Sequence, residues 1–118
     1  MKVGFVIGPY RSPEGHYGVK KNIDRAEEVA LCLWKLGYAV FCPHKNTSFF
    51  SGSAPEEVFL EGDLELLRRA DFAVTVKGWE RSEGSINEVK LCKDRNIPLY
   101  HSEGVFTSFD ELKKDKED

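Results

Sequence analysis

The stretch Phe72-Ala73-Val74-Thr75-Val76, followed after a short connection by Ser82-Glu83-Gly84-Ser85-Ile86-Asn87-Glu88, decides the fold of this chain. The first part is a continuous apolar run, which is typical of a strand buried on both faces. The second part is a turn of small residues that opens a run with helical periodicity. Such a turn leaves backbone N–H groups unpaired at the helix N-terminus, where a phosphate can bind. Glu88 would add a carboxylate about one turn into the helix, so the segment predicts a site that holds a phosphorylated ligand and acts on it.

The same alternation of strand and helix extends outward over the rest of the chain. Alternating strands and helices indicate a parallel sheet with helices on both faces and right-handed crossovers. We therefore expect an α/β fold, a flavodoxin-like three-layer sandwich with about four to five parallel strands in the order 2-1-3-4. One domain should span residues 1–118. The predicted strands are residues 2–8, 38–42, 72–76 and 97–101, and the predicted helices are residues 22–36, 53–69, 86–95 and 108–114.

Several element ends depend on single residues. Asn22 is a plausible N-cap for the first helix, which leaves residues 9–19 as a loop rich in Gly, Pro and Ser. Residues 44–54 are polar and are also predicted as a loop. The second helix opens on a capping-box pattern at residues 53–56.

The predicted strand order places two loops at one end of the sheet. In this order the chain reverses between the first and third strands, and ligands bind beyond the carboxyl ends of the strands at that point. The loops that leave those strands are Gly8-Pro9-Tyr10-Arg11 and residues 78–84. We therefore expect Gly8, Tyr10 and Arg11 to share one crevice with Ser82 and Gly84.

The carboxylates of this crevice also have ordinary interpretations. Ser85 and Glu88 match a capping box, in which the glutamate only accepts a hydrogen bond from a backbone N–H group. Asp63, taken alone, is typical of a solvated helix residue.

The other candidates have structural alternatives as well. Arg11 could hold a phosphate by a bidentate contact or be a mobile surface arginine. Ser82 and Gly84 could bind an anion or merely form the turn. Trp79 could stack on a planar base or pack at the sheet edge, and His44 could line the crevice or be structural.

Composition excludes several classes of protein. The net charge is -3 and no basic stripe is visible, so a nucleic-acid polymer is not expected as a partner. No segment approaches the roughly 20 apolar residues of a membrane span, and none has a signal-peptide core. The three cysteines have no metal-ligand spacing, so we expect reduced, mostly buried thiols in a cytoplasmic protein without a metal or cofactor.

At this point an ordered set of short motifs becomes recognisable. It consists of Gly8-Pro9-Tyr10-Arg11, residues 62–64 with 69–71, and Ser82-x-Gly84-x-x-x-Glu88. Together they resemble the nucleoside 2-deoxyribosyltransferase-like family, which includes the deoxynucleoside 5′-monophosphate N-glycosidases. The segment Gly78–Ser82 also resembles one found in a group of bacterial and phage proteins on that fold. The resemblance covers residues 2 to about 101.

The resemblance implies a role for each candidate. Glu88 matches the nucleophile that attacks the anomeric carbon, and Asp63 matches an acid that contacts the sugar. Arg11, Ser82 and Gly84 match the 5′-phosphate-binding positions, and His44 matches a crevice position of some relatives. Relatives that act on unphosphorylated nucleosides tend to carry Asp where Ser82 stands, which favours a nucleotide here.

Two positions depart from the pattern. Asn87 stands where relatives often have an apolar or aromatic residue. Pro9 stands where some hydrolases present a phosphate-binding hydroxyl. Both positions bear on which substrate is bound.

The resemblance therefore implies an N-glycosidase or deoxyribosyltransferase that acts on a (deoxy)nucleoside 5′-monophosphate. The alternatives are a nucleotide-binding module that senses its ligand without turnover, and a phosphate-binding domain that serves mainly in protein interaction. A homodimer or larger homo-oligomer is expected, because relatives complete their sites across a subunit interface.

Overall fold

The computed structural model describes residues 1–47, 50 and 52–102. Its four strands are β1 (Val3–Ile7), β2 (Ala39–Phe41), β3 (Phe72–Thr75) and β4 (Leu99–His101). They form one sheet in which every pairing is parallel, in the order β2-β1-β3-β4. The α/β class and the flavodoxin-like order 2-1-3-4 are therefore confirmed.

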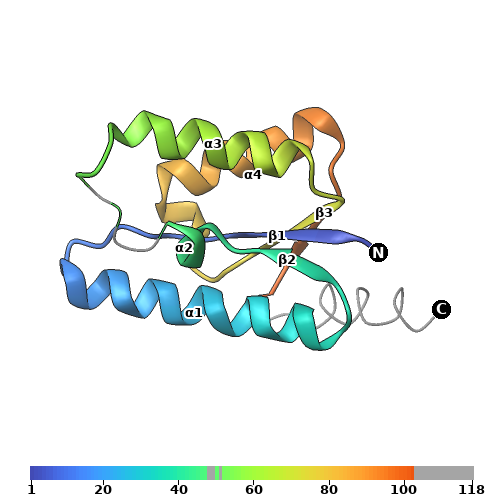
Figure 1. Cartoon of the computed structure of the whole chain (residues 1–118), viewed down its shortest axis with the longest axis horizontal. Coiled ribbons are helices and arrows are strands. Elements are labelled where there is room, and N and C mark those ends of the chain that lie inside the picture. The colour runs from blue at the N-terminus through green and yellow to red at the C-terminus, as the bar shows by residue number, and fades with distance from the viewer. Residues whose placement is uncertain (48–49, 51, 103–118) are drawn as a thin grey trace.

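Helices cover both faces of the sheet, as Figure 1 shows. Helix α1 (His16–Lys35) lies on one face, and α3 (Glu56–Arg68) and α4 (Glu83–Arg95) lie together on the other. The short α2 (Pro43–Asn46) follows β2, and a 3-10 turn, η1 (Trp79–Arg81), follows β3. The predicted helix at residues 108–114 lies outside the described residues.

The central strands are buried on both faces, which explains their continuous apolar sequences. In β1, Val6 packs into the core under α1, whereas Phe5 and Ile7 pack under α3 and α4. In β3, Val74 packs into the core under α1, and Ala73 packs under α3 and α4. Both strands are therefore fixed rigidly, and so are the points from which their loops leave the sheet.

The prediction for the start of the first helix was wrong. The helix begins at His16 rather than at Asn22, so the preceding loop is shorter than expected. Gly18, in the first turn of α1, lies so close to the preceding loop that a Cβ atom there would collide with the side chain of Ser12. The sequence predicts Gly18 within the loop, whereas in the structure it lies in α1 and contacts that loop.

Three further local predictions need correction. The capping box expected at residues 53–56 is wrong, because the N-cap of α3 is Pro55 and no side chain caps this helix. Pro43 opens α2 within what was expected to be a loop, since proline suits the first turn of a helix. Of the three thiols, Cys42 and Cys92 are buried but Cys32 is exposed.

Candidate active site

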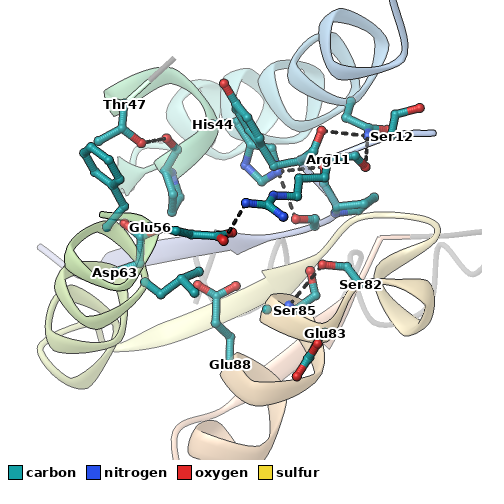
Figure 2. A pocket seen from close by; sticks show the side chains of 18 of the residues that line it. Arg11, Ser12, His44, Thr47, Glu56, Asp63, Ser82, Glu83, Ser85 and Glu88 are labelled. Atoms are coloured by element: carbon teal, nitrogen blue, oxygen red, sulfur yellow. Dashed lines mark hydrogen bonds and ion pairs between the residues drawn. The ribbon is translucent and has the colours of Figure 1, made fainter. Parts of the chain in front are cut away.

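A cleft lies at the carboxyl ends of β1 and β3, where the predicted strand order places it. Its volume is about 1230 Å³, which is ample for a ligand of nucleotide size. Figure 2 shows its walls, which come from the loop after β1, α2, α3, and the first turns of α4. The cleft is lined by all eight candidate residues from the sequence: Gly8, Tyr10, Arg11, His44, Asp63, Ser82, Gly84 and Glu88.

Ser82, and not Ser85, caps helix α4. Ser82 has an extended backbone conformation, and its side-chain oxygen accepts a hydrogen bond from the Ser85 N–H group at 3.2 Å. The capping-box interpretation of Ser85 and Glu88 is therefore wrong, and Glu88 is not needed to cap this helix. The polar first turn of α4 faces the cleft with Ser82, Gly84 and Ser85 among its lining residues.

Two features of this first turn suit a ligand better than they suit packing. Gly84 has room for a side chain, since an added Cβ atom would come no nearer than 3.8 Å to Leu60. Ser85 is 1% exposed, and its hydroxyl oxygen has no hydrogen-bond partner within the described part of the chain. A buried hydroxyl without a partner is costly, so a bound ligand that satisfies it would gain affinity.

Glu88 points its carboxylate into the cleft from α4, as Figure 2 shows. Among the described residues, none forms a hydrogen bond or ion pair with this carboxylate. Burial, with a further contribution from the charge of Asp63, raises the pKa of Glu88 to about 8. Burial also raises the pKa of Asp63, to about 6. The cleft thus holds two acids whose ionisation is made costly by their surroundings, which is common at catalytic sites.

The loop that carries Arg11 is held by two side chains from other elements. Burial lowers the pKa of His44, and its Nε2–H group donates to the carbonyl oxygens of Gly8, at 3.0 Å, and Pro9, at 3.1 Å. Asn22 donates from Nδ2 to the carbonyl oxygens of Tyr10, at 3.0 Å, and Arg11, at 3.2 Å. Four consecutive carbonyl groups are therefore fixed. His44 both lines the cleft and has a structural role, so the two interpretations of this residue are compatible.

Arg11 reaches from this loop to the opposite wall. Its guanidinium group forms an ion pair with Glu56, the first residue of α3, at 2.5 Å. The Arg11 side chain is 74% exposed, so the contact lies at the mouth of the cleft.

Sequence reasoning missed three residues of this site. The sequence predicts Asn22 as a helix cap, whereas in the structure its side chain holds the loop after β1. For Glu56 and Ser85 the sequence predicts only a place at a helix start. All three are polar residues at predicted helix starts. In an alternating parallel fold the helix starts lie near the carboxyl ends of the strands, so this was the available signal.

Trp79 belongs to the packing and not to the lining of the cleft. It packs beside the core under α3 and α4, and its ring stacks on His101 with centroids 6.0 Å apart.

A metal site and a membrane span are both absent from the described part of the chain. Residues 1–47, 50 and 52–102 contain no group of three His, Cys, Asp or Glu residues that could hold a metal ion. Within these ranges no helix has both the length and the apolar character needed to cross a membrane.

Comparison with solved structures supports the fold. No protein-family model matches the chain, and no curated protein matches its sequence. Among solved structures, it is similar to a 2-deoxyribosyltransferase from the psychrotolerant bacterium Bacillus psychrosaccharolyticus, with a TM-score of 0.59 and 22% sequence identity. The similarity covers 87% of this chain and 74% of that one. The chain therefore has the fold of a 2-deoxyribosyltransferase.

Proposed function

We propose that this protein cleaves the bond between base and sugar in a (deoxy)nucleoside 5′-monophosphate, with Glu88 as the nucleophile. The observation that carries the proposal is the Glu88 carboxylate, which points into the cleft beside Asp63 and serves no capping or ion-pairing role in the described structure. The fold shared with a 2-deoxyribosyltransferase supports the same class of reaction.

The chemistry follows from the charge that develops on the sugar. Breaking a glycosidic bond leaves an oxocarbenium-like centre at C1′, which a carboxylate beneath it can stabilise or trap as a covalent glycosyl-enzyme. In our proposal the deprotonated Glu88 forms a bond to C1′ while the C1′–N bond breaks, and the departing base keeps the electron pair and takes up a proton from water. Attack by water on C1′ would then break the bond to Glu88, return a proton to the solvent and release the sugar 5′-phosphate, which would make the enzyme a hydrolase. Attack by a second base would make it a transferase.

Asp63 would act on the sugar rather than on C1′. It lies on α3, across from Glu88 on α4, and both line the cleft. With a pKa of about 6, the Asp63 carboxyl group is mostly ionised at neutral pH and could accept a hydrogen bond from a sugar hydroxyl.

The first turn of α4 supports a phosphorylated substrate. Its unpaired N–H groups and the positive end of the helix dipole favour an anion, and Gly84 leaves open space above them. Ser82 adds a hydroxyl without the negative charge that an aspartate would bring. Arg11 can supply a charge-assisted contact once it leaves Glu56.

A nucleotide-binding module without turnover is the second candidate. It is favoured by the pKa of Glu88, because a carboxyl group with a pKa of about 8 is mostly protonated at neutral pH and is then not a nucleophile. Catalysis would require the bound substrate to favour the charged form, as a developing positive charge at C1′ does.

The test is a screen for base release. Deoxyribonucleoside and ribonucleoside 5′-monophosphates, together with the matching nucleosides, are incubated with the protein, with and without a second base. We expect free base from at least one monophosphate, and exchange of the base if the protein is a transferase. Tight binding of a nucleotide, without release of any base and unchanged by Glu88→Ala, would instead establish the binding module.

A further inference from the structure

The ion pair between Arg11 and Glu56 joins the two walls of the cleft. Arg11 lies in the loop after β1, whose carbonyl groups are held by His44 and Asn22, and Glu56 is the first residue of α3. Figure 2 shows the guanidinium group directed at the Glu56 carboxylate. In the described structure Arg11, a cation that we expect to contact a phosphate, is therefore already paired with a carboxylate of the same chain.

We propose that Glu56 is a specificity-determining residue, which competes with the ligand's phosphate for Arg11 and so limits the preference of the cleft for phosphorylated ligands. This inference rests on the proposed function, because it takes the cleft to bind a nucleoside 5′-monophosphate. A phosphate monoester carries a charge of about -1.5 to -2 at neutral pH and three acceptor oxygens, so it can displace a carboxylate with a single charge. An unphosphorylated nucleoside has no group that needs Arg11 and leaves the pair intact.

Replacing Glu56 by a phosphate as the partner of Arg11 costs little free energy, because the Arg11 and Glu56 side chains are both accessible to water. The side chains of Arg11 and Glu56 are 74% and 47% exposed. Ion pairs between exposed side chains contribute little to stability, so the pair should weaken nucleotide binding by no more than about 5-fold.

The position of Glu56 at the start of α3 further lowers the free-energy cost of breaking its ion pair with Arg11. Helix α3 has no side-chain cap, and Glu56 and Glu57 are the acidic residues of its first turn. Carboxylates are favourable near a helix N-terminus, so Glu56 keeps a stabilising interaction after it releases Arg11. The same carboxylate is then in place to recapture Arg11 and help a phosphorylated product to leave.

The test is a comparison of binding affinities. Dissociation constants are measured by calorimetry for a deoxynucleoside 5′-monophosphate and for the matching nucleoside. All proteins carry Glu88→Gln, so that bound ligand is not consumed. Glu56→Gln is expected to tighten binding of the monophosphate by about 2- to 5-fold and to leave the nucleoside unchanged. Glu57→Gln removes the same charge from the same helix turn without touching Arg11, and it is expected to leave both constants unchanged.

A double-mutant cycle separates competition from general repulsion. With Arg11→Gln in place, Glu56→Gln should no longer tighten binding of the monophosphate, because nothing remains to be released. Two results for Glu56→Gln would overturn the proposal. Weaker binding of the monophosphate would show that Glu56 positions Arg11 for the ligand, and unchanged binding would show that Glu56 has no effect on it. Equal tightening in Glu57→Gln would overturn it as well.

The outcome is separable from that of the proposed function. If the expected affinities are found and no nucleotide releases its base, the catalytic proposal fails while the role of Glu56 stands. If base is released and Glu56→Gln does not tighten binding, the role of Glu56 fails while the catalytic proposal stands.

Discussion

At the scale of single residues, Glu88 carries the chemistry that we propose. Ser82 already caps α4, so the Glu88 side chain can be changed without removing a cap. Glu88→Gln keeps the size of the side chain and removes its charge. We expect it to lower the rate of base release by about three orders of magnitude or more, as for other lost nucleophiles, while the protein stays folded. Circular dichroism checks folding, and a near-normal rate in the Gln variant would show that Glu88 is not the nucleophile.

The raised pKa of Glu88 also predicts how stability depends on pH. In the unfolded chain this carboxyl group loses its proton near pH 4.5, whereas in the folded protein it keeps the proton up to about pH 8. Between these values the folded state binds more protons, so the stabilising contribution is complete below pH 4.5 and is lost as the pH rises through 8. Asp63 adds the same trend between its ordinary value of 3.8 and about 6.

The measurement is the free energy of unfolding in denaturant across this range. Because water reaches the cleft, we expect wild type to lose about 1–3 kcal/mol relative to Glu88→Gln between about pH 5 and pH 9. Parallel pH profiles for the two proteins would contradict the prediction. In the same range, kcat/KM for base release should rise toward about pH 8, since only the ionised carboxylate can attack C1′.

Arg11 should matter for phosphorylated ligands alone. A guanidinium contact to a phosphate contributes about 1.5–3 kcal/mol, so Arg11→Ala should weaken nucleotide binding by about 10- to 150-fold. The matching nucleoside should lose little, because it has no group for Arg11 to contact. Equal losses for both ligands would show that Arg11 is structural.

At the scale of secondary-structure elements, Ser82 has two roles at the start of α4. Ser82 caps the helix through its hydroxyl oxygen and also lines the cleft. Ser82→Ala should lower the free energy of unfolding by about 0.5–2 kcal/mol, since the cap is lost. Ser82→Asp should preserve stability, because aspartate is an equally good cap, but it should weaken nucleotide binding by repelling the phosphate.

Thermal unfolding and ligand titration of the two variants separate these tasks. The expected pattern is a destabilised Ala variant and a stable Asp variant that prefers the nucleoside. An Asp variant that binds nucleotide as well as wild type would place the phosphate elsewhere in the cleft.

Much of the element order could be predicted from sequence, because the buried strands are encoded locally. Strand β3 lies within the predicted range 72–76. Because it is buried on both faces, its sequence is a continuous apolar run that is easily recognised as a strand. The starts of helices were less predictable. The sequence predicts Asn22 as the N-cap of α1, but its side chain holds the loop after β1, and the helix instead begins after Gly15, whose φ is 67°.

The candidate site also has one part that could be predicted from sequence and one part that could not. Its position could be predicted, since strand order alone brings the loops after β1 and β3 together. The partners of Arg11 could not, because Asn22 and Glu56 come from two other elements, 11 and 45 residues away along the chain. Contacts of this kind depend on tertiary packing, which residue spacing does not determine.

At the scale of the whole molecule, the position of the cleft predicts a homodimer. The cleft is open along walls built by α3 and α4, which pack together on one face of the sheet (Figure 1). Large apolar side chains are exposed on these same helices: Val58 is 56% exposed, Leu66 39% and Ile86 45%. A second copy that covers them would bury apolar surface beside the cleft and help to exclude water from it.

The prediction is a mass in solution of two chains at micromolar concentration, measured by light scattering or sedimentation. A stable interface usually buries more than about 1,000 Å², so one charge at its centre should disrupt it. We therefore expect Ile86→Asp to give a folded monomer. Leu31→Asp is the matched control, because Leu31 is 51% exposed on α1, on the opposite face of the sheet, and its change should leave the dimer intact. A monomeric wild type would contradict the prediction, and a dimer that only Leu31→Asp disrupts would place the interface on α1, away from the α3 and α4 walls of the cleft.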